Sequence, residues 1–166
     1  RLRDDKGEHL VPQEFLKAAE RYRLMGLIDR RVVQTALTAL GSGSLAVPPK
    51  RSVAINISGQ TLADAQFLEY VVECFDNTGA SPSQVCFEIA ENAVIANMEH
   101  ARRFIGVLHG MGCRFALDDF GSGLGSFSNL KNLAVDYLKI DGSFIRNLGR
   151  DAVNQAMVTA MIRLAR

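Results

Sequence analysis

Three polar residues that recur at a nearly constant interval constrain the fold of this chain most strongly. Asn56, Glu88 and Asp118 each stand near the end of an apolar, strand-like segment, at intervals of 32 and 30 residues. A (β/α)8 barrel of about 250 residues has eight units of roughly 31 residues. The interval therefore predicts an α/β fold with a mostly parallel sheet, in the form of a (β/α)8 barrel. Four such units cannot close an eight-stranded barrel, so the 166 residues are expected to supply only part of it.

Alternating strand and helix patterns support the same architecture. Strands are expected at 52–58, 85–91, 114–119 and 137–141. Helices are expected at 12–22, 29–40, 61–75, 97–109 and 151–164. Gly26 is expected to interrupt the first helical region, and Asp29 and Asp151 to cap the helices that follow them. Lys139 comes only 21 residues after Asp118, so their strands should be joined by a long loop with at most a short helix.

The composition excludes several classes of protein. Hydrophobic residues make up 48% of the chain and charged residues 22%, which is typical of a globular domain. Nineteen Lys and Arg against 18 Asp and Glu leave a formal charge of +1, which gives no electrostatic case for binding a nucleic acid polymer or a membrane surface. Apolar stretches fall short of the ~18–20 residues that a membrane span needs, and the first residues do not resemble a signal peptide. Three cysteines without the paired spacing of a zinc site predict reduced thiols and a cytoplasmic location.

Side-chain alternation along the expected strands places bulky apolar residues on one face and small or polar residues on the other. If the polar face points into a barrel, four side chains converge near the rim at the carboxyl ends of the strands: Asn56, Glu88, Asp118 and Lys139. Asp119 begins the following loop and can reach the same rim. Amide and carboxylate oxygens suit Mg²⁺ or Mn²⁺, and adjacent carboxylates that could bridge two ions suggest phosphoryl chemistry with a metal-activated water. Lys139 would hold that water or balance the phosphate charge.

A structural role is the alternative for each of these residues, because an isolated polar side chain in a strand is usually hydrogen-bonded or faces a loop. Four at equivalent positions favour a functional site, since burying several unpaired charges together is costly without a cation. Residues 119–121 match the Asp-Phe-Gly metal-binding triplet of kinases, but no glycine-rich strand or catalytic-loop motif accompanies them. The glycine-rich segment 121–125 lacks the lysine of a phosphate-binding loop and indicates a lid or a ligand-contact loop.

Four spaced motifs resemble the signature motifs of the EAL domain family. They are Ile-Asn-Ile-Ser at 55–58, Phe-Glu-Ile-Ala-Glu at 87–91, Asp-Asp-Phe-Gly-Ser-Gly at 118–123 and Tyr-Leu-Lys-Ile-Asp at 137–141. Residues 11–16, 19–20 and 27–29 are similar to the first helical region of the same family. The similarity covers nearly the whole chain and keeps the order of the motifs.

The resemblance implies a modified (β/α)8 TIM-like barrel, and a bacterial phosphodiesterase that hydrolyses the second messenger cyclic di-GMP to linear pGpG. It implies two Mg²⁺ or Mn²⁺ ions, with Asn56, Glu88 and Asp118 as metal ligands and Asp119 serving the second ion. Lys139 would orient the attacking water, and Glu91 would brace the loop at 119–128, which in this family supports metal binding and homodimer contacts. Family members often carry an adjacent cyclase-like or sensory domain, and such a longer protein can be anchored in a membrane elsewhere.

The resemblance also implies what a complete EAL domain would add to residues 1–166. The first strand would carry the Glu-Ala-Leu tripeptide, and the last strand–helix units would carry a Glu-Gly-Val-Glu region; each would supply a further Glu, and both are expected outside this chain. A non-catalytic cyclic di-GMP receptor is the alternative function, and those two Glu positions would separate it from the enzyme. A structural dimerisation module is a further alternative. The presence of Asp118 and Asp119 argues against it.

Overall fold

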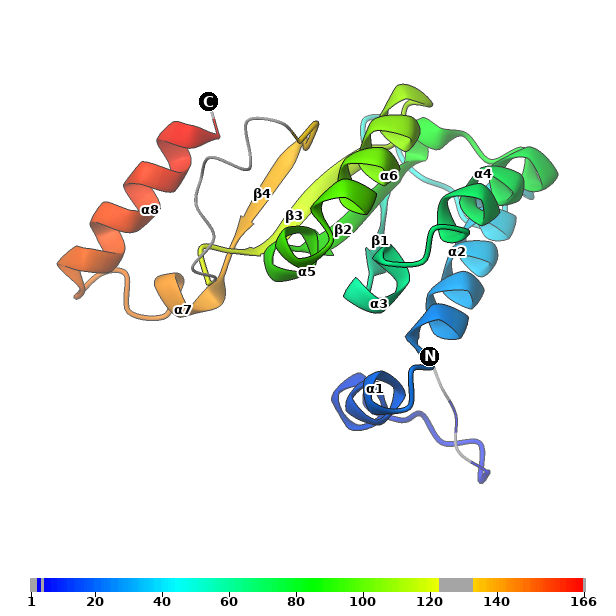
Figure 1. The fold of residues 1–166 in the computed structure, drawn as a ribbon, viewed down its shortest axis with the longest axis horizontal. Helices are drawn as coiled ribbons and strands as arrows, with labels where there is room; N and C mark the ends of the chain where they lie inside the picture. The colour runs from blue at the N-terminus through cyan, green and yellow to red at the C-terminus, as the bar shows by residue number, and fades with distance from the viewer. Residues whose placement is uncertain (1–2, 4, 123–132, 166) are drawn as a thin grey trace.

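The computed structural model, which describes residues 3, 5–122 and 133–165, is built around one parallel sheet. Its four strands have the order β1-β2-β3-β4, so each strand lies beside its neighbour in the sequence (Figure 1). The strands are β1 (Val53–Ile57), β2 (Val85–Ala90), β3 (Arg114–Phe120) and β4 (Tyr137–Ile140). Every strand pair is parallel, which confirms the predicted α/β class and the four expected strands.

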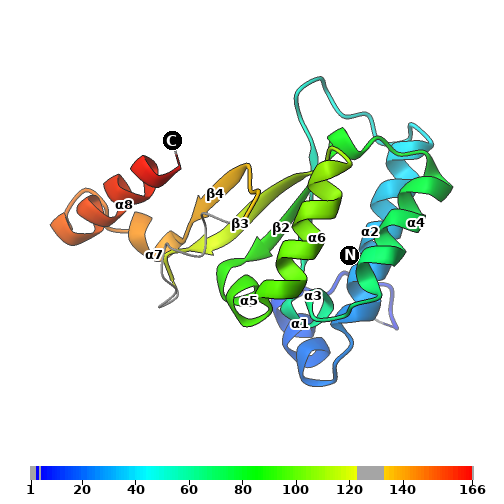
Figure 2. The ribbon, with the colours of Figure 1, turned by 45° about the horizontal axis from the view of Figure 1, so that its top comes forward.

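Helices precede, connect and follow the strands. They are α1 (Pro12–Arg21), α2 (Met25–Gly41), α3 (Gly59–Leu62), α4 (Phe67–Thr78), α5 (Glu91–Ala96), α6 (Met98–Gly110), α7 (Gly142–Ile145) and α8 (Ala152–Leu164), with a 3-10 turn η1 (Pro82–Gln84). Helices α2, α4 and α6 stand side by side along the sheet, whereas α8 lies beyond β4, at the opposite end from α1 (Figures 1 and 2). None of the helices in the described ranges is both long enough and apolar enough to cross a bilayer.

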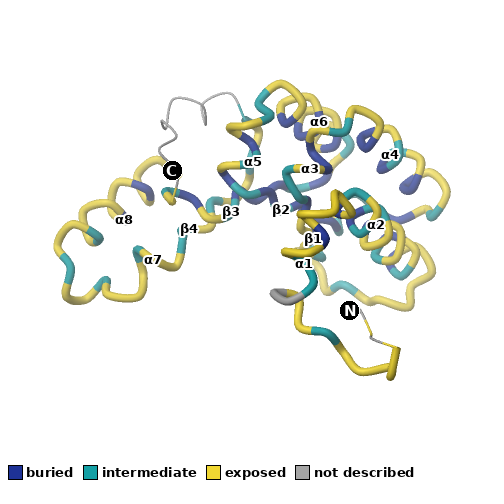
Figure 3. Tube along the Cα trace, turned by 60° about the horizontal axis from the view of Figure 1, so that its bottom comes forward, coloured by how far each residue is buried: buried dark blue, intermediate teal, exposed yellow. Residues whose placement is uncertain are grey.

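The core lies between these helices and one face of the sheet, and most residues of β2 and β3 are buried there (Figure 3). Phe87 on β2 and Phe115 on β3 have ring centroids 5.7 Å apart, and Phe104 on α6 lies against them at 5.6 and 6.0 Å. Phe67 on α4 extends the aromatic cluster, 5.7 Å from Phe104. All four rings are buried, so apolar packing occupies this face of the sheet and leaves the opposite face for polar side chains.

Helix α2 differs from the prediction at its beginning. It starts at Met25, so Gly26 does not interrupt the helical region and Asp29 does not cap a helix; both predictions are wrong. The physical reason is a tertiary contact: Asp29 is only 4% exposed, and its carboxylate accepts a hydrogen bond of 2.9 Å from the N–H of Ser58, just after β1. An acid suited to a local cap therefore joins a helix to a strand 29 residues away.

The helix expected at 61–75 is divided into α3 and α4. Between them Asp64 accepts a hydrogen bond of 2.9 Å from the N–H of Gln66, which closes a turn. Asp64 also forms a 2.9 Å ion pair with Arg30 of α2, and the hydrogen bond from Arg30 holds the pKa of Asp64 below its ordinary value. Apolar residues keep their helical spacing across this break, so the periodicity alone could not locate it.

Two further boundaries bear on the site and on the last helix. Helix α5 follows β2 directly, so Glu91, expected as the last residue of the strand, is the first residue of a helix. Helix α8 begins as predicted, because the carboxylate of Asp151 accepts hydrogen bonds from the N–H groups of Val153 and Asn154.

Candidate functional site

The register of the strands brings the three predicted metal ligands onto one face of the sheet. Asn56 is the partner of Glu88 in the β1–β2 pair. Asp118 is the partner of Ala90, two residues beyond Glu88, in the β2–β3 pair. Because side chains two residues apart on a strand share a face, Asn56, Glu88 and Asp118 all point away from the aromatic core.

Lys139 on β4 joins this polar face through two short ion pairs. Its Nζ lies 2.7 Å from Glu88 Oε2 and 2.7 Å from Asp118 Oδ2, and donates a hydrogen bond to each. Partial burial lowers the pKa of Lys139, but the hydrogen bonds and charges of Asp118 and Glu88 together outweigh this effect, so the pKa is raised above its ordinary value. Lys139 is therefore a cation at neutral pH, and it holds together two carboxylates that would otherwise repel each other.

Asp119 adopts an uncommon backbone conformation beside this cluster. Its φ is +53°, in the left-handed region that few residues other than glycine adopt. The register between β3 and β4 shifts between Leu117 and Phe120, which marks a bulge. Asp118 and Asp119, although they are neighbours on a strand, both line the same cleft as Asn56. The bulge accounts for this, because it turns the end of β3 out of regular alternation.

Glu91 contacts the segment that follows Asp119. The Glu91 side chain is buried at 6% exposure, and its Oε2 accepts a hydrogen bond of 2.8 Å from the N–H of Gly121. Gly121 has a φ of +92°, and a Cβ there would overlap the end of Met161 and lie 3.1 Å from Phe144. The start of the predicted loop is thus held from two sides, while residues 123–128 of that loop lie outside the described residues.

The polar face borders an open cleft of about 600 Å³ between the sheet and helices α1 and α2. Asn56, Asp118 and Asp119 line it from the strands, and apolar side chains such as Phe15 and Val32 line it from the helices. Ligand sites typically occupy clefts of ~300–1,000 Å³ that combine an apolar wall with a few polar groups. The cleft therefore has room for a ligand of several hundred daltons with its polar end against the strands.

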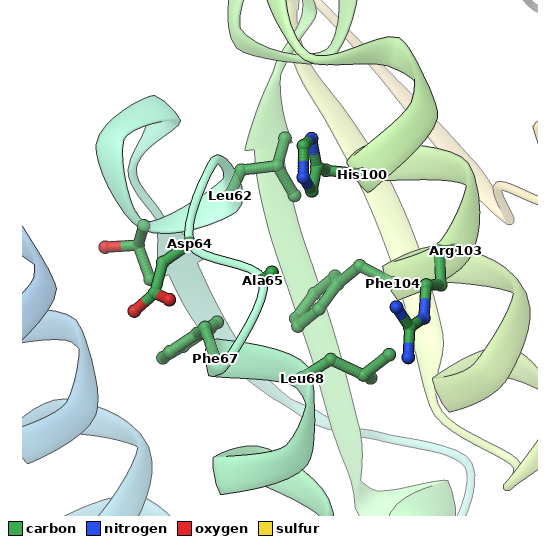
Figure 4. A pocket seen from close by; sticks show the side chains of 9 residues that line it. Leu62, Asp64, Ala65, Phe67, Leu68, His100, Arg103 and Phe104 are labelled. Carbon is green, nitrogen blue, oxygen red and sulfur yellow. The ribbon is translucent and has the colours of Figure 1, made fainter.

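A second, much smaller pocket lies near α3, α4 and α6 (Figure 4). Its volume is about 20 Å³, and its apolar lining includes Leu62, Leu68 and Phe104. That volume admits about one water molecule. Phe104 packs against the apolar face of the sheet, so this pocket is separated by the sheet from the polar face and is unsuited to a substrate.

The donor atoms of the polar face fit a hard divalent cation in type. Asn56 offers an amide oxygen, and Glu88 and Asp118 offer carboxylate oxygens, which are the ligands that Mg²⁺ and Mn²⁺ prefer. Within the part of the chain that the structure describes, no group of three or more His, Cys, Asp and Glu side chains is placed to hold a metal ion. The match of this face to a metal ion is therefore one of donor type.

Asp29 also borders the cleft, and the sequence reasoning assigned it only to a helix cap. A signal for its burial was present in the sequence. Asp29 stands four residues after Met25 and four before Val33, in the same stripe as Leu37, and this whole stripe of α2 is buried. A carboxylate within an apolar stripe of a helix indicates a tertiary partner, because a buried charge without one is costly.

The family model of the EAL domain matches residues 1–166 of this chain. The cyclic di-GMP phosphodiesterase PdeB of Shewanella oneidensis is 39% identical over 165 residues, which cover 97% of this chain and 19% of that protein. The cyclic di-GMP phosphodiesterase PdeF of Escherichia coli K12 is 32% identical over 166 residues, which cover 100% of this chain and 22% of that protein. The chain thus spans about a fifth of the length of these curated relatives.

Solved structures have the same arrangement of helices and strands. The PaMucR phosphodiesterase in complex with c-di-GMP matches 100% of this chain and 67% of its own with a TM-score of 0.88 and 27% identity. The FimX EAL domain from Pseudomonas aeruginosa bound to c-di-GMP matches 98% of this chain and 64% of its own with a TM-score of 0.85 and 28% identity. By sequence and by fold, the chain belongs to the EAL domain family, and its parallel sheet is part of a TIM-like (β/α)8 barrel.

Proposed function

We propose that this chain carries the metal-binding face of a phosphodiesterase that hydrolyses cyclic di-GMP to linear pGpG. The observation that carries the proposal is the cluster of Lys139, Glu88 and Asp118, with both ion pairs at 2.7 Å, on the same sheet face as Asn56. The names of the relatives PdeB and PdeF support the substrate.

Asn56, Glu88 and Asp118 would hold one Mg²⁺ or Mn²⁺ ion, and Asp119 would serve a second. When bound, such ions polarise phosphoryl oxygens and make a bound water more acidic. Glu91 would keep the backbone after Asp119 in place through its hydrogen bond with Gly121. Apolar side chains of α1 and α2 would contact the guanine faces in the cleft.

The role proposed for Lys139 follows from its charge. Its Nζ donates a hydrogen bond of 2.7 Å to each of Glu88 and Asp118, at the point where the proposed metal ligands meet. Lys139 would therefore orient the attacking water and balance phosphate charge.

Turnover by the full-length protein tests the proposal. We expect cyclic di-GMP to be converted to pGpG in the presence of Mg²⁺ or Mn²⁺, with chromatography and mass spectrometry identifying the product, and to remain intact after chelation. Glu88→Gln and Asp118→Asn keep the side-chain shape and should each lower the rate by ~10²–10³ or more. Glu69→Gln, on the exposed side of α4, is the matched control. Unchanged turnover in either site variant would count against the assigned ligand roles.

A non-catalytic cyclic di-GMP receptor is the second candidate. It is favoured by the charge balance that Lys139 already gives Glu88 and Asp118 without a metal ion. The receptor would bind cyclic di-GMP in a calorimetric titration yet leave it intact in the presence of Mg²⁺ or Mn²⁺. Detection of pGpG would reject it.

Three further expectations remain predictions. They are a homodimer formed through the loop after Asp119, adjacent cyclase-like or sensory domains, and a cytoplasmic location. Residues 123–132, through which the dimer contact is expected, lie outside the described residues.

A further inference from the structure

We propose that Asp29 is a positioning residue, which fixes the carboxyl end of β1 and thereby the place of Asn56 in the metal site. The proposal rests on the function proposed above for Asn56. It concerns a residue of α2 that approaches the site only through the fold, because Asp29 and Asn56 are 27 residues apart in the sequence.

The first observation is the burial of the Asp29 carboxylate. Asp29 is 4% exposed and lies in the buried stripe of α2 between Met25 and Val33. Removing a carboxylate from water is costly unless strong hydrogen bonds replace the water. Its Oδ2 accepts such a bond, 2.9 Å long, from the N–H of Ser58. A costly buried acid is thus placed where it fixes one specific point of the backbone.

The second observation is what lies on either side of that point. Asn56 is two residues before Ser58 and is the last residue but one of β1. On the other side, the Ser58 hydroxyl accepts a hydrogen bond of 3.2 Å from the N–H of Thr61 and begins α3. Asp29 therefore determines where β1 ends and α3 begins. Asp29 and Asn56 also line the same cleft, so a shift of this junction would move Asn56 relative to Asp118.

The third observation is a matching arrangement on β3. Glu91 is likewise a buried acid on a helix, and it likewise accepts the N–H of a residue just beyond a strand that carries site residues. Asp29 with Ser58 after β1 repeats what Glu91 with Gly121 does after β3, at 2.9 and 2.8 Å. The described residues contain just these two buried carboxylates, and both have this arrangement. The carboxyl ends of β1 and β3 are thus each held by a buried acid of a helix, Asp29 of α2 and Glu91 of α5.

The experiment measures Mn²⁺ binding by the full-length protein from the electron paramagnetic resonance signal of the free ion, without turnover. Asp29→Ala removes the acceptor for Ser58 N–H, and we expect the affinity for Mn²⁺ to fall by about 10-fold or more, as for other residues that support metal ligands. Asp29→Asn keeps an oxygen acceptor of the same shape and should remain close to the wild type. Asp64→Ala, which removes an acid from a different helix junction, is the control for a general loss of stability.

Each result decides the proposal. An Asp29→Ala variant with the Mn²⁺ affinity of the wild type, or of Asp64→Ala, overturns the proposal. An Asp29→Asn variant with an Mn²⁺ affinity as low as that of Asp29→Ala also overturns it, because the charge of Asp29 rather than its hydrogen bond would then matter. If Asp29→Ala does not fold, Asp29→Leu fills the same space without an acceptor and makes the same test. A wild type that binds no Mn²⁺ overturns the metal site and this positioning role together. A wild type that binds Mn²⁺ but leaves cyclic di-GMP intact contradicts only the phosphodiesterase function, since positioning is measured from metal binding.

Discussion

Lys139 is the residue on which the charge balance of the polar face depends. Glu88 and Asp118 come from neighbouring strands, and Lys139 Nζ lies between them at 2.7 Å from each. The Lys139 side chain is 43% exposed, so solvent screening reduces what these ion pairs contribute to stability. Their main consequence is therefore the geometry and charge of the site rather than the stability of the fold.

Replacing Lys139 separates a role in the chemical step from a role in metal binding. We expect Lys139→Ala to lower the rate of cyclic di-GMP hydrolysis by ~10²–10³. The affinity for Mn²⁺ should fall by less, because Asn56, Glu88 and Asp118 remain. Steady-state kinetics together with a metal titration measure both quantities, and Lys17→Ala on the exposed side of α1 is the control. A rate constant equal to that of the wild type would remove Lys139 from the mechanism.

At the scale of single residues, the sequence predicts best the side-chain positions that follow from alternation along a strand. The alternation placed Asn56, Glu88 and Asp118 on one face, and the strand register brings them together there. It could not predict the left-handed conformation of Asp119, because a bulge arises from the pairing of two strands and not from one strand alone. It could not predict the partner of Asp29 either, since that hydrogen bond exists only when α2 packs beside β1.

At the scale of the elements, Gly41 at the end of α2 lies against the end of α4. A Cβ on Gly41 would overlap the carbonyl oxygen of Thr78, at the end of α4. A backbone carbonyl at the end of a packed helix cannot move aside as a side chain can. The glycine therefore permits the close contact of two helices that cover the same face of the sheet.

Two glycine-to-alanine variants test this contact. Gly41→Ala should destabilise the protein by ~1–3 kcal/mol, because the helices must move apart. Gly106→Ala, in the middle of α6 with nothing within 4 Å of the new Cβ, should stabilise it by ~0.5–1 kcal/mol, since alanine loses less backbone entropy in a helix. Chemical denaturation measures both values. Equal effects of the two substitutions would show that the close approach at Gly41 does not limit stability.

The elements were predicted well where one periodicity holds from end to end, as in the four strands and in α8 with its Asp151 cap. Predictions failed where a short polar turn interrupts a continuing apolar pattern. Asp64 and Gln66 form such a turn between α3 and α4, and the ion pair of Asp64 with Arg30 ties that turn to α2. Interactions between elements, which no single segment contains, decide these boundaries.

At the scale of the whole molecule, the reactivity of two buried cysteines reports whether the core is intact. Cys86 on β2 and Cys113 just before β3 are free thiols with 6% and 2% exposure. Burial, together with the charge of Glu88, raises the pKa of Cys86 to about 11, and burial raises that of Cys113 to about 12. Neither thiol is therefore poised for nucleophilic or redox chemistry in the folded protein.

Thiol labelling tests this description. At pH 8.5, where an exposed cysteine is about half ionised, the thiolate of Cys86 should be on the order of a hundredfold scarcer, so labelling should be slow in native buffer and fast in denaturant. The free energy of unfolding should also depend on pH, because the pKa values of Cys86 and Cys113 in the folded protein lie above the unfolded value of ~8.5. The contribution is fully present below that pH and is lost as the pH rises through about 11. Rapid labelling of all cysteines in native buffer would contradict the buried positions.

The order of the strands in the sheet has a consequence for synthesis of the chain on the ribosome. Since strand order follows chain order, β1 can pair with β2, and β2 with β3, before β4 has left the exit tunnel. During that interval the acids of β2 and β3 face each other without the ammonium group that will later separate them. A nascent chain that paired its strands in this order would carry an uncompensated pair of negative charges until the fourth strand arrived.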